Sequence, residues 1–167
     1  NLIGRTSMGV LSENPFTVAN DIIEKIKNNV DIIVVDFHAE ATAEKICFAK
    51  FLAETYNNEE NALIKGFFGT HTHVQTADEK ILKGMAYITD AGFCGVEDSV
   101  IGMEFATSLR RLSTSLPERY EIAQSSVAQI NGVEVLIDRT MSTQIKRINF
   151  NVDNSNNESE VNVESDG

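Results

Sequence analysis

The 167-residue sequence has only two cysteines, Cys47 and Cys94, and no apolar run near the roughly 20 residues that a membrane-spanning helix needs. These cysteines form neither a disulfide framework nor a C-x-x-C metal pair. No signal peptide is visible, and because the chain begins NLIGR without a methionine, we expect a processed or partial chain. Together these absences favour a cytoplasmic protein that does not enter the membrane.

Basic residues are also scarce, with 14 Lys and Arg against 25 Asp and Glu and a net charge of −11. Five of the acids and no base lie in residues 151–167, so the remainder is only mildly acidic. Binding to a nucleic-acid backbone depends on clustered Lys and Arg, and we therefore expect no broad nucleic-acid surface. A small anionic substrate is compatible with this charge where a metal ion supplies positive charge locally.

The apolar pattern predicts one α/β domain over residues 1–150. Asn14, followed by a proline, predicts the start of a helix whose core-facing side carries Val18, Ile22 and Ile26. Strong helix formers predict a second helix over 41–56. Continuous apolar runs predict three buried strands of an α/β sheet, each ending in a polar loop, over residues 32–35, 62–68 and 85–89.

The last third of the sequence has a different pattern. A helix is predicted over residues 103–112, and an antiparallel meander follows, with Asn131 and Gly132 as a hairpin turn. Residues 151–167 are rich in Asn, Ser and Glu, which predicts a disordered acidic tail. The strands of the meander are expected over residues 120–129, 133–138 and 144–150.

All three histidines of the chain follow predicted strands. His71 and His73 are two residues apart in GTHTHVQTAD, and on an extended segment their side chains would point to the same side, about 7 Å apart. An isolated pair of this kind is more often explained by local hydrogen bonds. His38, at the exit of the first predicted strand, shifts the balance toward one metal site at a shared edge of the sheet. Three imidazoles suit Zn, Mn, Fe, Co or Ni.

Nearby carboxylates are candidates for accepting a ring N–H from such histidines and fixing their tautomers. Asp36, Asp78 and Asp90 are the candidates for this role, although Asp36 could cap a helix or end its strand, Asp78 could be solvated, and Asp90 could hold a turn. For Glu40, a solvated position is favoured.

Four blocks of sequence resemble, in order, the YmdB-type family of bacterial metallophosphodiesterases, within the calcineurin-like metallophosphoesterase superfamily. The blocks are DFHAEATAEK, GTHTHVQTADEKIL, YITDAGFCG and SLPERYEIA. The resemblance implies the C-terminal half of a four-layer α/β/β/α sandwich that hydrolyses cyclic nucleotides or similar phosphodiesters. It also implies two divalent metal ions, manganese or iron with zinc as the alternative, and it assigns His38 and His71 to one ion and His73 to the other.

The carboxylate, asparagine and further histidine ligands of that family have no counterpart in this chain. We therefore expect the missing N-terminal half to be a partner, the chain alone to be inactive with no catalytic residue of its own, and exposed sheet edges to favour a homo-oligomer. Two alternatives remain open at this point. One is a mononuclear three-histidine zinc enzyme, and the other is a non-catalytic metal-binding or regulatory fragment.

Overall fold

The computed structural model describes four stretches of the chain, residues 1–9, 12–58, 62–138 and 143–155. They form two compact units. The first unit contains residues 1–92 and 132–148, and the second contains residues 93–131 and the chain from residue 149. Two long strands, β7 (Val127–Ile137) and β8 (Thr143–Asp153), contribute residues to both units.

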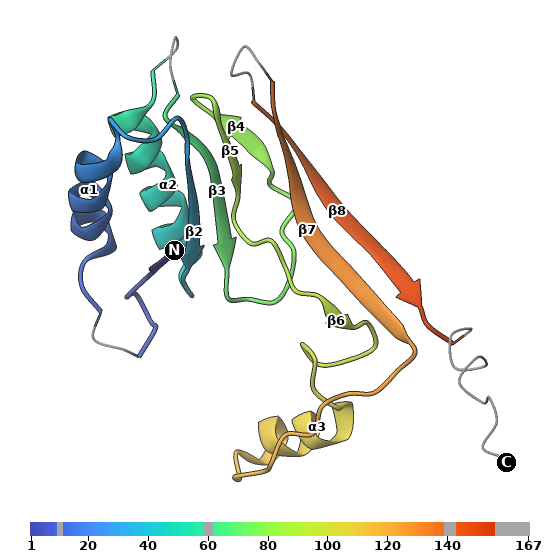
Figure 1. Ribbon diagram of the computed structural model, residues 1–167. Helices are drawn as coiled ribbons and strands as arrows, with labels where there is room; N and C mark the ends of the chain where they lie inside the picture. Colours follow the sequence, from blue (N-terminus) through green and yellow to red (C-terminus); the bar gives the residue numbers. More distant parts are fainter. Residues whose placement is uncertain (10–11, 59–61, 139–142, 156–167) are drawn as a thin grey trace, which may run out of the picture. The chain divides into compact units, whose positions relative to one another are not determined.

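The first unit is built on a five-stranded sheet with the order β1-β2-β3-β5-β4 (Figure 1). Its strands are β1 (Leu2–Ile3), β2 (Ile33–His38), β3 (Ile64–Thr70), β4 (Lys80–Leu82) and β5 (Met85–Ile88). β1, β2, β3 and β5 are parallel, and β4 is antiparallel to β5. The mixed α/β class and the three predicted strands are thus confirmed. Parallel strands bring their carboxyl ends to one edge, where open α/β sheets bind ligands.

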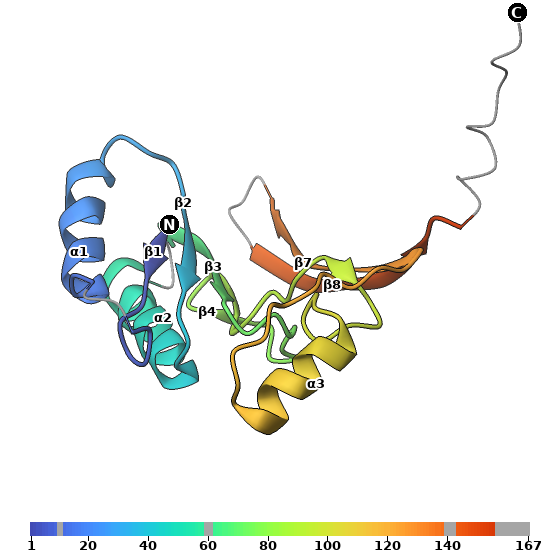
Figure 2. The same ribbon diagram turned by 90° about the horizontal axis from the view of Figure 1, so that it is seen from below.

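Two helices, α1 (Pro15–Ile26) and α2 (Thr42–Tyr56), lie on the same side of β2 and β3 (Figures 1 and 2). The core between them and the sheet is aromatic, with the ring centroids of Phe37 and Phe48 4.6 Å apart. Side chains alternate along β2, so Val35 is buried by this layer while Val34, on the other face, is 52% exposed.

Helix α1 begins where the sequence predicts, because the Asn14 side chain accepts the Phe16 N–H at 3.1 Å. Its predicted core-facing side is wrong. Ala19 and Ile23 are buried, whereas Ile22 is 45% exposed. The buried residues of α1 are Pro15, Ala19 and Ile23, so the buried face is centred one position away from the predicted row.

The second unit contains β6 (Gly95–Val96), which pairs antiparallel with β7, and α3 (Phe105–Thr114), whose N-terminus is capped by the Glu104 carboxylate. The predicted hairpin turn at Asn131 and Gly132 is wrong, since both residues lie inside β7. The Asn131 amide instead donates to the Phe93 carbonyl, and Gly132 has no positive φ of the kind that an Asn-Gly turn requires.

Two other boundaries differ from the prediction in this part of the chain. The strand predicted over 120–129 begins only at Val127, and β8 runs to Asp153, three residues into the predicted tail. Residues 156–167 of that tail lie outside the described residues. Cys47 and Cys94 are free. Across the described stretches, no helix is long and apolar enough to cross a membrane.

Candidate metal centre

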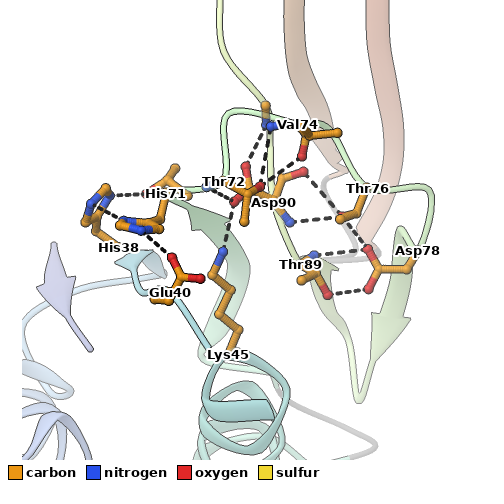
Figure 3. A network of polar contacts seen from close by, with 12 residues as sticks. His38, Glu40, Lys45, His71, Thr72, Val74, Thr76, Asp78, Thr89 and Asp90 are labelled. Carbon is orange, nitrogen blue, oxygen red and sulfur yellow. Dashed lines mark hydrogen bonds and ion pairs between the residues drawn. The ribbon is translucent and has the colours of Figure 1, made fainter. Parts of the chain in front are cut away.

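Two histidines, one at the end of β2 and one directly after β3, meet at the carboxyl edge of the five-stranded sheet. His38 is the last residue of β2 and is in register with Thr70, the last residue of β3, so His71 follows directly beside it. Nδ1 of His71 lies 3.0 Å from Nε2 of His38, with the ring centroids 4.8 Å apart (Figure 3). The predicted convergence is therefore observed for these two side chains, while their role as metal ligands stays a prediction.

The outer nitrogens of the two rings also have partners. His38 Nδ1 lies 3.1 Å from the Thr70 hydroxyl, and His71 Nε2 lies 2.5 Å from the Glu40 carboxylate (Figure 3). An ionised carboxylate only accepts, so His71 Nε2 carries a proton, and in a neutral ring its Nδ1 is then the acceptor. His38 must consequently donate from Nε2 and accept from Thr70 at Nδ1. Each ring thus has one defined tautomer.

Glu40 was predicted to be solvated, and the structure places its carboxylate against His71 although half of the side chain is exposed. The sequence offered one signal, since Glu40 follows His38 by two residues just beyond the end of β2. Without the spatial pairing of β2 and β3, that spacing does not show which histidine the carboxylate reaches. The contact is to the histidine of the neighbouring strand.

The segment that carries His71 and His73 is not extended, which corrects the sequence prediction. Both residues have positive φ, 122° for His71 and 60° for His73, and β3 ends before them at Thr70. Non-glycine residues adopt such backbone conformations when the surrounding structure enforces them, often at functional sites. His73 is exposed and lies in the same loop as His71.

A buried ion pair contacts the backbone of this segment. Asp90 and Lys45 are both fully buried, with 2.8 Å between Oδ2 and Nζ (Figure 3). The Asp90 carboxylate also accepts the N–H groups of Thr72 and Gly92, each at 3.0 Å. Burial opposes ionisation of Asp90, but these hydrogen bonds outweigh it and lower the pKa of the carboxyl below its ordinary value. Asp90 thus holds the turn after β5, which was the alternative for this residue, while its predicted role in fixing a histidine tautomer stays a prediction. Lys45 was missed.

Asp78 anchors the other end of the same loop. Its carboxylate accepts the Thr76 hydroxyl at 2.6 Å and both the hydroxyl and the N–H of Thr89, at 2.5 and 3.1 Å (Figure 3). Burial raises the pKa of Asp78, yet the hydrogen bonds from Thr76 and Thr89 dominate and lower it. The solvated alternative for Asp78 is therefore wrong. Between the two ends, the Gln75 amide donates to the Gly132 and Ile148 carbonyls.

Asp36 lies in the middle of β2, so neither the helix-capping nor the strand-ending alternative holds. Its Oδ2 accepts the Asn1 amide at 2.7 Å. Its Oδ1 is buried and has no hydrogen-bond partner among the described residues. A buried, unpaired carboxylate oxygen is costly. Asp36 is thus the one predicted carboxylate whose bonding is incomplete within the described part of the chain.

The types of ligand atom at this edge suit a divalent transition metal, because such metals usually bind imidazole nitrogens that have a carboxylate nearby. The geometry is incomplete. Within the described stretches, no group of three or more His, Cys, Asp or Glu side chains is arranged to hold a metal ion, and the rings of His38 and His71 face each other. A metal site here requires further ligands and the loss of the hydrogen bond between the two rings.

The first unit has an open, mostly parallel α/β sheet with imidazoles, carboxylates and hydroxyls at its carboxyl edge, the edge where α/β proteins of this class bind ligands. The sequence profile of the YmdB-like proteins matches residues 1–148, and the chain belongs to that family. The resemblance carried by the four sequence blocks is thereby confirmed.

Individual relatives also place the chain in this family. A 2′,3′-cyclic-nucleotide 2′-phosphodiesterase of Bacillus subtilis is 39% identical over 92% of this chain and 55% of its own length. A putative phosphatase/phosphodiesterase of Mycoplasma pneumoniae is 38% identical over 87% of this chain and 49% of its own. A crystal structure described as a novel phosphatase of Mycoplasma pneumoniae superposes with a TM-score of 0.76 at 34% identity, covering 95% of this chain and 54% of that one. The chain spans about half the length of the relatives that it matches.

Proposed function

We propose that this chain carries the histidine part of a metal-dependent phosphodiesterase site that acts on cyclic nucleotides or similar phosphodiesters. The observation that supports the proposal is the 3.0 Å approach of the His38 and His71 rings at the carboxyl edge of the sheet. Two strands far apart in the sequence deliver these side chains, in a family whose relatives include a 2′,3′-cyclic-nucleotide 2′-phosphodiesterase.

In this proposal, His38, His71 and His73 are ligands of two divalent ions, manganese or iron with zinc as the alternative. Bound divalent ions would supply positive charge to the phosphate oxygens and activate the attacking water. The residues of this chain orient the ligands. Glu40 holds the Nε2 proton of His71, and the Thr70 hydroxyl holds His38 at Nδ1. The Glu40 contact leaves Nδ1 of His71 available to a metal ion. To bind through Nε2, His38 would have to carry its proton on Nδ1 instead, where the Thr70 hydroxyl can accept it.

The rest of the site is proposed to come from residues beyond this sequence, in a four-layer sandwich. Three observations support this. The relatives are about twice as long as the matched region, the outer face of β2 leaves Val34 half-exposed, and the buried Asp36 Oδ1 has no partner in the described residues. We therefore expect the 167-residue chain alone to bind metal weakly and to hydrolyse phosphodiesters slowly or not at all. With two free cysteines, the chain also suits the reducing cytoplasm.

The test compares hydrolysis of 2′,3′-cyclic AMP, with manganese present, by the 167-residue chain alone and by a protein that also carries the segment matching the other half of the relatives. Activity is expected only in the second case, and His38→Ala or His71→Ala in that protein should lower kcat by at least a hundredfold. Glu54→Gln, a surface change on α2, is the matched control and should leave kcat unchanged. Metal binding without hydrolysis in the longer protein would refute the proposal and favour a non-catalytic metal-binding module.

A further inference from the structure

The ion pair between Lys45 and Asp90 requires an explanation other than stability. Both side chains are fully buried, and removing two charges from water costs several kcal/mol, which their attraction repays only in part. An apolar pair of similar size would fill the same volume at no such cost. A buried charge pair in this position is therefore expected to bind polar groups of the protein, which an apolar pair could not do.

The backbone bonds of Asp90 show what is held. One carboxylate oxygen accepts the N–H of Thr72 at 3.0 Å, and Thr72 lies between the two residues with positive φ, His71 and His73. The other oxygen accepts the N–H of Gly92, which turns the chain after β5. Charge-assisted hydrogen bonds are about twice as strong as neutral ones, so the carboxylate can hold the unfavourable backbone conformation on both sides of Thr72.

Gly69 makes the contact between Lys45 and Asp90 possible. A Cβ atom at this position would overlap the Thr89 carbonyl oxygen and would come within 3.0 Å of Cδ of Lys45. Because Gly69 has no side chain, the Lys45 stem lies close to the backbone of β3 on its way from α2 to Asp90. Three segments distant in the sequence thus combine to hold the backbone of the histidine loop.

We propose that the buried Lys45–Asp90 pair positions the His71–His73 segment for metal binding, so that both are positioning residues of the metal centre. The inference rests on the proposed function, which makes these histidines metal ligands. Asp90 acts through the Thr72 N–H, and Lys45 acts by keeping the Asp90 carboxylate ionised and oriented inside the protein. Neither residue touches a ligand in this account.

The test replaces the pair with apolar side chains, as K45M/D90L, in the 167-residue chain. The core stays filled, but the Thr72 N–H loses its acceptor. Cobalt(II) serves as the metal probe because its absorption spectrum reports nitrogen and oxygen ligation. We expect cobalt affinity to fall roughly ten- to a hundredfold, the usual effect of losing a group that orients a ligand. Independently of metal, the Thr72 amide should exchange its hydrogen at least tenfold faster by NMR.

Two further variants complete the design. K45M/D90N retains one acceptor oxygen for the backbone, so its cobalt affinity and Thr72 exchange rate should lie between those of the wild type and K45M/D90L; it also serves if K45M/D90L does not fold. K83Q/E54Q, which removes the exposed ion pair between α2 and the β4–β5 turn, should change neither readout.

The outcomes separate this inference from the proposed function. If the wild-type chain binds no cobalt, as the proposed function allows for a chain without the other ligands, the Thr72 exchange rate alone decides whether the pair holds the segment. If the wild type binds cobalt, unchanged affinity in K45M/D90L overturns the positioning role, whatever the amide does. An unchanged Thr72 exchange rate in K45M/D90L overturns it in either case.

Discussion

The carboxyl edge of the five-stranded sheet has two regions with opposite properties. In the anchor region, Asp90 and Asp78 have oxygens that accept hydrogen bonds from backbone and side-chain donors, and Asp90 is fully buried. In the histidine region, the side chains of His71 and Glu40 are a third and a half exposed, and the rings of His38 and His71 bond to each other through one nitrogen each. The anchor region fixes the backbone, and the histidine region leaves its side chains accessible.

This difference shows how one loop can combine a fixed backbone with side chains that are accessible to a ligand. The Asp90 and Asp78 carboxylates are held by several hydrogen bonds each, whereas the partly exposed imidazoles lose little when a ligand replaces their mutual hydrogen bond. Substitutions in the anchor region should therefore lower the free energy of unfolding. Substitutions in the histidine region should change ring chemistry and ligand binding with little effect on that free energy.

The largest effect on stability is expected from Lys45→Met. The variant leaves the Asp90 carboxylate buried without its cationic partner, which should reduce the free energy of unfolding by about 3–5 kcal/mol. Urea denaturation at pH 7 measures the loss. Lys83→Met, at the exposed pair with Glu54, is the control and should cost less than about 1 kcal/mol. Similar losses in the two variants would contradict the distinction between buried anchor and exposed surface.

A smaller loss is expected from Gly69→Ala, which places a methyl group against the Thr89 carbonyl and the Lys45 stem. Overpacking of this kind typically costs about 1–3 kcal/mol. Gly132→Ala is a matched control, because nothing lies within 4 Å of a Cβ at that position and its φ is not positive. Its unfolding midpoint in urea should stay close to that of the wild type. An equal shift in both variants would mean that crowding at the sheet edge is not the cause.

The sequence predicted the strands that have continuous apolar runs. The runs that became β3 and β5 are buried on both faces, whereas β2 is buried on the helix side and leaves Val34 exposed on the other. Their parallel order places His38 and His71 at one edge. The wrong predictions concern residues whose side chains bond to a segment far away in the sequence. Asn131 and Gly132 read as a turn, but the Asn131 side chain bonds to the Phe93 carbonyl inside a sheet.

The polar partners of the site could not be predicted, because they depend on contacts between segments far apart in the sequence. From the sequence alone, Lys45 would be expected to be a solvated helix residue. In the structure it lies against Gly69 and bonds to Asp90, 45 residues further along the chain. Glu40 lies two residues after His38 in the sequence, but its carboxylate bonds to His71, which follows the neighbouring strand β3. The motif GTHTHVQTAD identified the family, while the reason for its Thr, Gln and Asp residues emerged only from the folded backbone.

Asp78→Asn tests the other anchor through its dependence on pH. The folded pKa of Asp78 lies below its ordinary value of 3.8, so its ionised form stabilises the folded state above that pH, and the contribution is lost as the pH falls through the folded pKa. The variant should lose about 1 kcal/mol at pH 7 and less at pH 2.5 relative to the wild type, measured by urea denaturation. Asp31→Asn, at an exposed position, should show no such convergence. A loss that is equal at both pH values would contradict the assignment.

The smallest effect on stability is expected from Glu40→Gln, within about 0.5 kcal/mol, because the carboxylate is half exposed. Its effect on ring chemistry should be clear. The amide no longer presents two accepting oxygens to His71 Nε2, so the ring is no longer confined to one tautomer. In the wild type, the two ¹⁵N shifts of the His71 ring should differ widely at a pH where it is neutral, and in the variant they should move toward each other. Glu13→Gln, in the exposed segment before α1, is the control, and an unchanged pair of shifts in Glu40→Gln would show that the Glu40 contact does not select the tautomer.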